Sequence, residues 1–578
     1  MNGTLRTSHV GTSVLLHGWI QKRRDFGELI FLDLRDRTGI AQVVVDKERG
    51  AGDQLVSTAK ELRSEFVVRI EGEVVERAGA QKNPKLPTGD IEIVAKNIVI
   101  LNRAETPPFP IEDDTDAAEE LRLQYRYLDL RRPSLARNLT MRHKMLTAVR
   151  NYFDRHGFLE IETPILTKST PEGARDYLVP SRVHKGEFFA LPQSPQIFKQ
   201  LCMVAGLERY FQIARCFRDE DLRRDRQPEF TQIDVEASFI DEEFIYALME
   251  GLFADIFPIA NIQVTTPFPR MTWQEAMDRF GIDRPDTRFG MELIDVTEVA
   301  KTTAFEPFRN AATVRAIVVP NGAAFSRKRI DDVTEEAKKL GATGLVWIKF
   351  NAEKQSSIKK FLDDAAFDAL RNAVRANDGD LALIVAGTVT RVWDVLGSLR
   401  LKIAADEKMI PAETWHFLWV TDFPLYEWDE ESGRYFARHH PFTSPRLEHL
   451  DKLESDPGSV LARAYDLVLN GIELGGGSIR INQPEVQQRM FRALGISDED
   501  ARGRFGFLID AFRYGAPPHG GIAFGVDRIA MMMARAESLR DVIAFPKTAR
   551  AQDLMCGAPS GVDDRQLHEL GIGVRGNE

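Results

Sequence analysis

The segment Tyr210–Glu236 reads YFQIARCFRDEDLRRDRQPEFTQIDVE, two runs of alternating polarity on either side of a loop of charged residues. Because successive side chains of a strand point to opposite faces, each run predicts a strand with two unlike faces. The apolar face of the resulting antiparallel hairpin carries Phe211, Ile213, Phe217, Ile233 and Val235, with Arg215 as an interruption. Its polar face offers a cation, amides, carboxylates and one aromatic ring, contributed by Gln212, Arg218, Phe230, Gln232, Asp234 and Glu236.

Two interpretations of this hairpin are open. The polar face suits a ligand that has phosphates, a flat base and an ammonium group. The simpler interpretation is an amphipathic hairpin whose outer face is solvated, as is common in antiparallel sheets. The segment alone favours the simpler interpretation, so other parts of the chain have to decide.

Composition indicates an ordinary globular protein of several domains. The chain has 578 residues, 43% hydrophobic and 28% charged, which is too long for one core. A formal net charge of -11 argues against a non-specific nucleic-acid coat but leaves room for local basic patches. The three cysteines are scattered and show neither a disulfide framework nor zinc spacing. With no signal-peptide pattern and no apolar run of membrane-spanning length, a cytoplasmic protein without a membrane contact is expected.

The first 105 residues predict a small closed barrel. Short strand patterns separated by turn signals occupy residues 14–19, 29–34, 40–45, 66–73 and 91–100. Five such strands favour an OB-fold. Between the first two strands, the basic run 21–27 and the ring of Phe31 offer cations for phosphates and a platform for unstacked RNA bases. A solvated charged hairpin with Phe31 in the barrel core is equally open.

The next segments predict a connector and the start of a second domain. Residues 106–130 combine a stiff proline-rich run with an acidic run. Residues 131–156 carry a helical period that ends at Gly157. Residues 158–164 form a short alternating strand, and Pro164 confines it to an edge or an interface because proline cannot donate to a ladder.

A polar segment and a helix follow. Residues 167–176 have the composition of a mobile lid. A helix is expected with Ser194 as its N-cap and Pro195 at its first position, and it presents Gln196 and Lys199 on one face. A lysine near the N-terminus of a helix interacts unfavourably with the helix dipole, so its position there suggests a bound anion. The simpler alternative is that Lys199 is an ordinary surface lysine.

Residues 287–415 alternate between helix and strand patterns and carry few motifs of ligand-binding residues, which predicts an α/β insertion domain.

Motifs rich in polar residues and glycine resume after the insertion domain. The triple glycine 475–477 lacks the Lys-Ser/Thr of a P-loop, and it is more typical of a strand that lies flat beneath a ligand. Glu473 and Arg480 are seven apart and would face opposite ways in a regular strand, so a bulge is required if both reach one site.

Three stretches resemble the signatures of class II aminoacyl-tRNA synthetases: Gly157–Pro164, Phe217–Phe230 and Gly525–Arg528, the last opening an apolar helix. Four more narrow the resemblance to the aspartyl branch of subclass IIb, namely residues 169–176, 193–199, 439–443 and 475–480. The insertion between the second and third signatures marks the bacterial type. The resemblance implies a multidomain α+β protein. Its expected parts are an OB-fold anticodon-binding domain (1–105), a hinge (106–130), an antiparallel-sheet catalytic domain in two pieces (131–286 and 416–555), the α/β insertion (287–415) and a C-terminal extension (556–578).

The implied reaction joins aspartate to ATP as aspartyl-adenylate and then transfers aspartyl to tRNA(Asp). The amino acid's own carboxylate attacks the α-phosphate, so positioning and charge stabilisation replace a covalent nucleophile. The resemblance makes Arg218 the catalytic cation on the α-phosphate and Arg528 the clamp on the far side of ATP. Further implied ATP contacts are Asp219, Glu220, Gln227, Phe230 (under the adenine), Glu473, Gly525, Val526 and Asp527. Mg²⁺ is expected as the cofactor, held by Asp466 and Glu473.

The resemblance also implies how aspartate is recognised. Its ammonium would meet Glu172, Gln196 and Asp234. Its side-chain carboxylate would meet Arg480 and Lys199, with His439 and His440 nearby, and Arg218 is a further implied aspartate contact. An arginine fork matches a carboxylate and leaves a donor unpaired against an amide, so asparagine should be rejected. The alternative for the two histidines is a packed structural role.

In the barrel, the resemblance makes Phe31 a stacking platform for anticodon bases, with Arg24, Gln42 and Glu92 as edge contacts. Related enzymes that charge only tRNA(Asp) often carry leucine at the position of Phe26, and relaxed ones that also charge tRNA(Asn) often carry histidine. Phenylalanine is neither. The strict form is favoured weakly, because a phenyl ring offers no hydrogen bond to a second base.

Three other functions compete with this one. They are an asparaginyl-tRNA synthetase, a non-discriminating enzyme that charges both tRNA(Asp) and tRNA(Asn), and a non-catalytic RNA-binding paralogue. Arg480 with Lys199 argues against the first, and the presence of the expected charged residues argues against the last. The family further implies a homodimer with the Pro164 region at the subunit interface.

Overall fold

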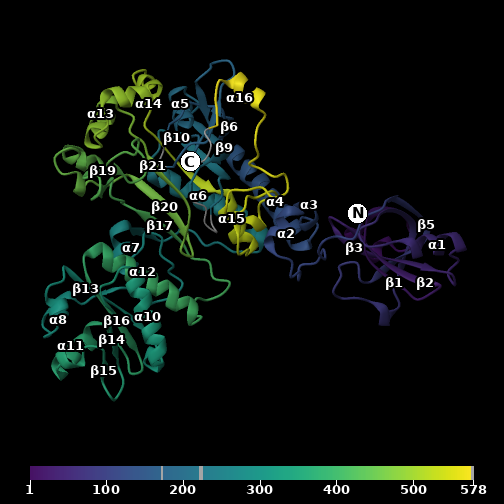
Figure 1. Cartoon of the computed structure of the whole chain (residues 1–578), viewed down its shortest axis with the longest axis horizontal. Helices are drawn as coiled ribbons and strands as arrows, with labels where there is room; N and C mark the ends of the chain where they lie inside the picture. Colours follow the sequence, from purple (N-terminus) through teal and green to yellow (C-terminus); the bar gives the residue numbers. More distant parts are fainter. Residues whose placement is uncertain (171–173, 221–225, 575–578) are drawn as a thin grey trace. The chain divides into compact units, whose positions relative to one another are not determined.

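The computed structural model of the chain describes residues 1–170, 174–220 and 226–574 (Figure 1). Contacts within the chain divide it into two compact units. One comprises Met1–Arg142 and Arg540–Gly561, and the other His143–Leu539 and Val562–Glu578. Among the described residues, no helix is both long and apolar enough to cross a bilayer.

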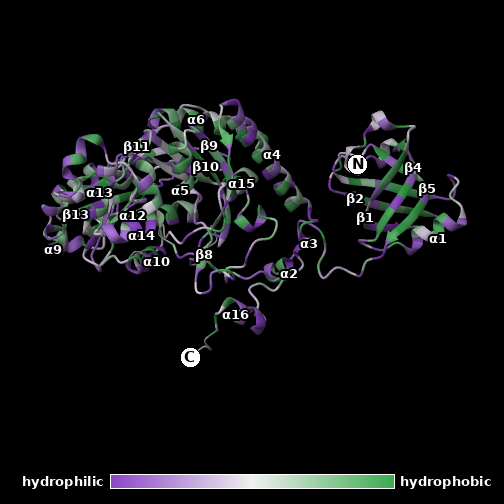
Figure 2. Ribbon diagram, turned by 90° about the horizontal axis from the view of Figure 1, so that it is seen from above, coloured by the Kyte–Doolittle hydropathy of each residue, from purple (hydrophilic) through white to green (hydrophobic). Residues whose placement is uncertain are grey.

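The first unit contains the predicted barrel, closed in the order β1-β2-β3-β5-β4. Its strands are β1 (Ser13–Asp25), β2 (Leu29–Asp36), β3 (Gly39–Asp46), β4 (Val67–Glu76) and β5 (Ile91–Asn102). Alternate residues of β2, Ile30, Leu32 and Leu34, are fully buried in the barrel core, and Figure 2 shows green hydrophobic stretches along β1, β4 and β5. The OB-fold prediction is confirmed, and helix α1 (Asp53–Glu61) is an addition that the turn signals did not indicate.

The expected connector is more structured than its composition indicated. Residues 119–129 form two short helices, α2 (Glu119–Gln124) and α3 (Arg126–Asp129). The fully buried carboxylate of Asp129 lies 2.6 Å from Arg126 and 3.0 Å from Arg132. The Arg126 guanidinium also donates to the backbone oxygens of Arg540, Ile543 and Ala544. A stretch more than 400 positions away therefore holds the connector, which sequence patterns do not reveal.

The second unit is built on an eight-stranded sheet in the order β11-β17-β20-β21-β22-β10-β9-β6. Only the two outer pairs, β11–β17 and β6–β9, are parallel. The strands are β6 (Leu159–Glu160), β9 (Arg209–Phe217), β10 (Glu229–Ser238), β11 (Arg270–Thr272), β17 (Phe417–Thr421), β20 (Ala464–Leu469), β21 (Ile472–Ile479) and β22 (His519–Gly525). The short strand predicted before Pro164 is β6, at the sheet edge as expected.

Helices and two small hairpins accompany this sheet. The helices are α4 (Pro133–Arg155), α5 (Gln196–Val204), α6 (Glu242–Ile256), α7 (Trp273–Phe280), α13 (Pro484–Ala493), α14 (Asp498–Phe512), α15 (Val526–Ala534) and α16 (Asp564–Leu570). The hairpins are β7 (Leu178–Pro180) with β8 (Phe188–Ala190), and β18 (Tyr426–Asp429) with β19 (Arg434–Ala437). The N-cap prediction for Ser194 is wrong by one position. Helix α5 begins at Gln196 after Pro195, and the Ser194 hydroxyl accepts from the Gln196 backbone nitrogen at 3.3 Å.

The hairpin Tyr210–Glu236 forms as β9 and β10, with Gln212 opposite Asp234. Its outer face is not solvated: the side chains of Asp234 and Glu236 are fully buried. Strand β22 pairs with the other edge of β10, and helix α5 packs against β10. The simpler interpretation of the pattern is therefore wrong, because tertiary contacts cover the polar face.

Residues 287–415 form the expected α/β arrangement. Five antiparallel strands pair in the order β12-β13-β16-β14-β15, namely β12 (Ile294–Asp295), β13 (Thr313–Val319), β14 (Val346–Lys349), β15 (Gln355–Ser356) and β16 (Leu381–Gly387). Their helices are α8 (Thr297–Lys301), α9 (Glu306–Arg309), α10 (Arg327–Lys339), α11 (Asp364–Ala373) and α12 (Val389–Asp406).

Candidate active site

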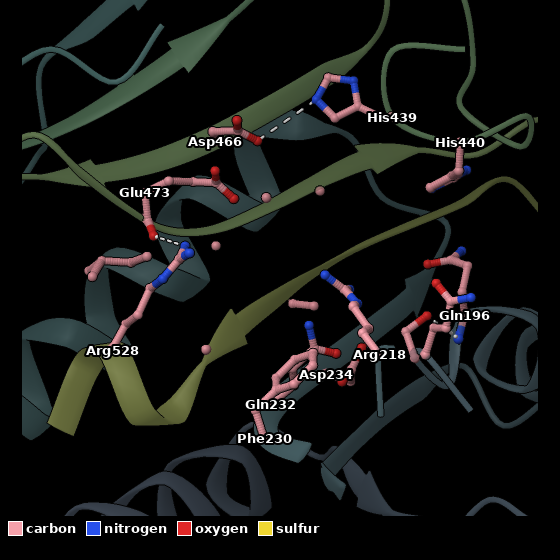
Figure 3. Close-up of a pocket in the computed structure, with 18 of the residues that line it drawn as sticks. Gln196, Arg218, Phe230, Gln232, Asp234, His439, His440, Asp466, Glu473 and Arg528 are labelled. Atoms are coloured by element: carbon pink, nitrogen blue, oxygen red, sulfur yellow. Dashed lines mark hydrogen bonds and ion pairs between the residues drawn. The ribbon is translucent and has the colours of Figure 1, made fainter. Parts of the chain in front are cut away.

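A cavity of about 610 Å³ in the second unit collects most of the predicted ligand-binding residues (Figure 3). Those that line it are Gln196, Lys199, Arg218, Glu220, Gln227, Phe230, Asp234, His439, His440, Asp466, Glu473, Arg480, Gly525, Asp527 and Arg528. They come from β10, β20, β21, β22, α5, α15 and neighbouring loops. Residues more than 300 positions apart in the sequence thus meet at one site.

Two predicted residues in the described part of the chain, Val526 and Asp219, are not part of this cavity lining. Glu172 lies outside the described residues. Val526 is fully buried at the start of α15. Asp219 donates its backbone N–H to the backbone oxygen of Arg175 at 3.0 Å.

Four buried charges form the centre of the site. In this buried quartet, Lys199 Nζ lies 3.2 Å from Asp234 Oδ1 and 3.5 Å from Glu236 Oε2. The Arg480 guanidinium donates to both Glu236 oxygens, from Nε at 2.9 Å and from Nη2 at 3.1 Å. Two cations and two carboxylates at such distances offset one another, so the charges can stay in a dry environment.

Burial affects the two carboxylates of the quartet differently. Burial raises the pKa of Asp234 above its ordinary value, and Lys199 only partly opposes this. Burial acts in the same direction on Glu236, but Arg480 and Lys199 outweigh it and hold the pKa of Glu236 below its ordinary value. Glu236 was placed on the polar face by the alternation of β10 but was not predicted as a site residue. Its pairing with Arg480, 244 positions away, gives no local signal.

Two polar atoms at the edge of the quartet have no partner among the described residues: Asp234 Oδ2, an acceptor, and Gln196 Nε2, a donor. Both residues line the cavity. An unpartnered buried polar atom costs about 1–3 kcal/mol, so each is best explained by a ligand group that completes it. An ammonium suits the carboxylate oxygen, and a carboxylate oxygen suits the amide nitrogen.

The two histidines are half-buried, and their surroundings favour the neutral form. Burial, helped by Arg438, lowers the pKa of His439 to about 4, and burial with Arg480 brings the pKa of His440 well below its ordinary value. One ring nitrogen of His440 lies 2.7 Å from Arg480 Nη1. His439 Nε2 lies 3.9 Å from Asp466 (Figure 3). Each histidine thus touches a predicted ligand-binding side chain, which a purely packed histidine would not require.

Asp466 and Glu473 face the cavity from neighbouring strands β20 and β21 (Figure 3). The predicted bulge is present: Val468 pairs with Glu473 and Leu467 with Gly475, which leaves Leu474 over. Burial raises the pKa of Asp466 well above its ordinary value, and the nearby Glu473 raises it further.

The triple glycine leaves room for one of these carboxylates. A Cβ on Gly476 would lie 2.3 Å from Asp466 Oδ1, and Cβ atoms on Gly475 and Gly477 would meet the backbone of β22 at 2.1 Å. Neighbouring strands and Asp466 therefore already require glycine here. Two carboxylates fit a Mg²⁺ ion that keeps waters and binds phosphates. Within the described chain, no group of three or more His, Cys, Asp or Glu side chains forms a complete cage.

The other end of the cavity has a ring and two arginines. The Arg218 guanidinium carbon lies 5.0 Å from the centre of the Phe230 ring. Arg528 Nη1 donates to the Glu473 backbone oxygen at 2.8 Å (Figure 3). Asp527 accepts from the Thr231 backbone nitrogen at 3.0 Å. This arrangement provides a flat platform between cations, which suits a purine nucleotide.

The five residues predicted for RNA contact lie together on the barrel of the first unit. Arg24 bonds Asp33 at 3.0 Å and Gln42 at 3.2 Å, and Gln42 donates to Glu92 at 3.0 Å. The Arg24 guanidinium carbon lies 5.5 Å from the centre of the Phe31 ring, which contacts the ring of Phe26 edge-on at 6.1 Å.

The exposure of Phe31 and Phe26 shows whether their rings belong to the barrel core or to its surface. Phe31 is half-buried and is not among the buried core residues of the barrel, so its interpretation as core is wrong. Phe26 is 68% exposed.

Comparison with known proteins shows which families match the two parts of the chain. The family described as tRNA synthetases class II (D, K and N) matches residues 118–549. The chain belongs to the class II tRNA synthetases. The OB-fold nucleic acid binding domain family matches residues 14–101 of this synthetase.

Individual relatives agree along nearly the whole synthetase. A protein of Geobacillus kaustophilus named aspartate–tRNA ligase is 56% identical, covering 99% of this chain and 98% of its own length. One of Anoxybacillus flavithermus named aspartate–tRNA(Asp/Asn) ligase is 53% identical with the same coverage. The solved asparaginyl-tRNA synthetase of Pyrococcus horikoshii shares the fold at a TM-score of 0.58 and 20% identity, covering 94% of this chain and 96% of its own.

Proposed function

We propose that this synthetase is an aspartate–tRNA ligase. It joins L-aspartate to ATP as aspartyl-adenylate with release of pyrophosphate, and then transfers aspartyl to the 3′ end of tRNA(Asp). The observation that carries the proposal is the buried quartet with its two unpartnered polar atoms, because it offers cations to a side-chain carboxylate and an acceptor to an ammonium. The names of the 53–56% identical relatives support the same activity.

For the first step, we assign the nucleotide to the end of the cavity that holds Phe230. The adenine stacks on that ring, Arg528 holds the far phosphates, and Arg218 faces the α-phosphate. Negative charge builds on the α-phosphate as the aspartate carboxylate attacks, so a cation fixed there stabilises the transition state more than the ground state. Glu220 and Gln227, which line the same end, contact the nucleotide.

Asp466 and Glu473 would hold Mg²⁺, which would neutralise phosphate charge when ATP is bound. The support is the space that Gly476 leaves at Asp466. In this chain both carboxylates also repel each other, so a cation between them relieves that repulsion.

For aspartate, we assign the ammonium to Asp234 and the side-chain carboxylate to Arg480 and Lys199, with Glu172 and Gln196 completing the site. Asparagine would set its amide N–H₂ against these cations. A site whose buried donors are left unpaired discriminates by about 10⁴–10⁵, so no editing step is needed.

For tRNA, we assign the anticodon to the barrel face of Arg24, Phe26, Phe31, Gln42 and Glu92. We favour charging of tRNA(Asp) alone, because the exposed ring of Phe26 offers no hydrogen bond to a second base. The non-discriminating alternative has support from the relatives whose names include Asp/Asn. Charging purified tRNA(Asp) and tRNA(Asn) side by side separates the two.

We further propose that the enzyme is a cytoplasmic homodimer, as the family implies. Around Pro164, the apolar side chains of Leu159, Ile165 and Leu166 are 49–52% exposed, which suits burial against a second subunit. We also propose the domain boundaries that the family resemblance implies, with residues 106–130 as the hinge between the anticodon-binding and catalytic domains.

The central test is ATP–pyrophosphate exchange. We expect exchange with aspartate and none above background with asparagine at equal concentration. Equal exchange with both amino acids would refute the assignment of Arg480 and Lys199 to the substrate carboxylate.

A further inference from the structure

We propose that Gln193 is a positioning residue for Arg218. Its side-chain amide holds residues 174–176 against the end of β9, and this fixes the backbone on both sides of the arginine. The inference rests on the proposed function, because it needs Arg218 to act on the α-phosphate.

The Gln193 amide is fully used. The residue is buried in the loop between β8 and α5. Its Nε2 donates to the Ala174 backbone oxygen at 2.8 Å and to Asp176 Oδ1 at 2.6 Å, and its Oε1 accepts from the Ala174 backbone nitrogen at 3.2 Å. The Gln193 amide bonds both the backbone N–H and the backbone C=O of Ala174, as a neighbouring strand would do in a sheet. Residues 174–176 are therefore held in place although they are not part of a regular strand.

The Arg218 backbone nitrogen donates across the hairpin to the Pro228 oxygen at 2.9 Å, and the residues on either side of Arg218 are attached to the two segments that this amide joins. The Phe217 backbone nitrogen donates to the oxygen of Pro192 at 2.9 Å, and the Asp219 backbone nitrogen donates to the oxygen of Arg175 at 3.0 Å. Pro192 directly precedes Gln193, and Arg175 lies between the two residues that Gln193 binds. The residues before and after Arg218 are thus each attached to one side of the Gln193 clamp.

The other described contacts of this segment are weaker or lie at its end, where the Leu191 backbone nitrogen donates to the Tyr177 oxygen at 2.9 Å. The Arg175–Asp219 ion pair has a 3.7 Å separation and side chains 80% and 46% exposed, and such pairs contribute little. Asp176 uses its second oxygen to accept from the exposed Ser169 hydroxyl at 2.7 Å. Losing the amide would therefore loosen residues 174–176 and weaken the bond to Asp219.

A released Arg218 should affect the rate more than binding. Misplacement of a catalytic group by about 1 Å can cost about 100-fold in rate. Ground-state contacts of ATP and aspartate are spread over the rest of the cavity and remain. The clamp therefore predicts a fall in kcat with little change in KM, whereas a residue that directly binds substrate would raise KM.

The test uses an exchange of amide and carboxylate. Gln193→Glu cannot donate to Ala174 or Asp176 and sets two carboxylates against each other. Asp176→Asn alone keeps its acceptor for Gln193. In the double variant the introduced amide donates to the introduced carboxylate, which restores the side-chain bond with the partners reversed but not the bond to the Ala174 oxygen. In ATP–pyrophosphate exchange, we expect Gln193→Glu to lose about ten-fold or more in kcat with both KM values within about two-fold, and the double variant to recover part of that loss.

Gln488→Glu is the matched control, because Gln488 is exposed on α13 and undergoes the same change of charge. Circular dichroism verifies that each variant is folded. If Gln193→Glu does not fold, Gln193→Met, of similar size and without an amide, is measured in its place and should show the same loss in kcat.

An unchanged kcat in the single variant would overturn the inference, as would a double variant no better than the single one, or a loss carried by KM. A wild-type enzyme without aspartate-dependent exchange would instead refute the proposed function.

Discussion

Glu236→Gln tests whether the buried quartet prepares Arg480 for the substrate. Glu236 accepts two charge-assisted bonds from Arg480, at 2.9 and 3.1 Å. The glutamine oxygen can still accept one of them, but its nitrogen cannot accept the other. A hydrogen bond to a charged group contributes about 1.5–3 kcal/mol. At about 1.4 kcal/mol per tenfold change, this predicts a loss of about 10- to 150-fold in kcat/KM for aspartate.

The assay is ATP–pyrophosphate exchange with aspartate varied at saturating ATP. KM for ATP should stay within about two-fold, because the nucleotide end of the cavity does not touch Glu236. Glu250→Gln is the control: Glu250 is also buried, accepts from Trp419 Nε1 at 3.1 Å and does not line the cavity. An aspartate kcat/KM within about three-fold of the wild type, or an equal rise in KM for ATP, would refute the idea that Glu236 holds Arg480.

Three further outcomes are expected. Phe31→Ala should lower kcat/KM for tRNA about 5- to 150-fold and leave pyrophosphate exchange intact, because stacking contributes about 1–3 kcal/mol per base; parallel loss of both activities would count against the barrel assignment. Gly476→Ala sets a Cβ 2.3 Å from Asp466 Oδ1 and should raise the Mg²⁺ concentration for half-maximal exchange, whereas Gly503→Ala, where a Cβ meets open space, should not. Burial lowers the pKa of His519, so the folded state binds fewer protons than the unfolded one; its contribution to stability is complete above about pH 6.5 and is lost as the pH falls through the folded pKa. His519→Gln should make the urea midpoint fall less between about pH 7.5 and pH 5.5, and an unchanged pH dependence would contradict this.

Periodicity predicted the strands but not what covers them. The alternation in residues 229–236 placed Asp234 and Glu236 correctly on one face of β10. Whether that face is solvated depends on β22 and α5, which are distant in the chain, so the pattern alone favoured the wrong interpretation. The connector shows the same limit, since Asp129 and Arg126 are buried by residues 540–544.

For the site, motifs that resemble a known family predicted about half of the residues that line the cavity. The seven-residue spacing of Glu473 and Arg480 also predicted the bulge. Side chains of a regular strand alternate between its two faces, so residues an odd number apart face opposite ways unless a bulge intervenes. Two of the residues that were missed, Glu236 and Gln193, bond other protein groups. Their partners are set by tertiary packing, and a single sequence carries no local signal for that.

The burial of the quartet has a consequence for how the two halves of the reaction respond to ionic strength. Charges that are buried and offset one another are screened only weakly by salt. Arg24, by contrast, is half-exposed on the barrel face, and RNA binding through exposed cations weakens steeply as counter-ions accumulate. Rising salt should therefore inhibit the two steps of the reaction at different concentrations. Adenylate formation would persist at salt concentrations where charging of tRNA has already failed.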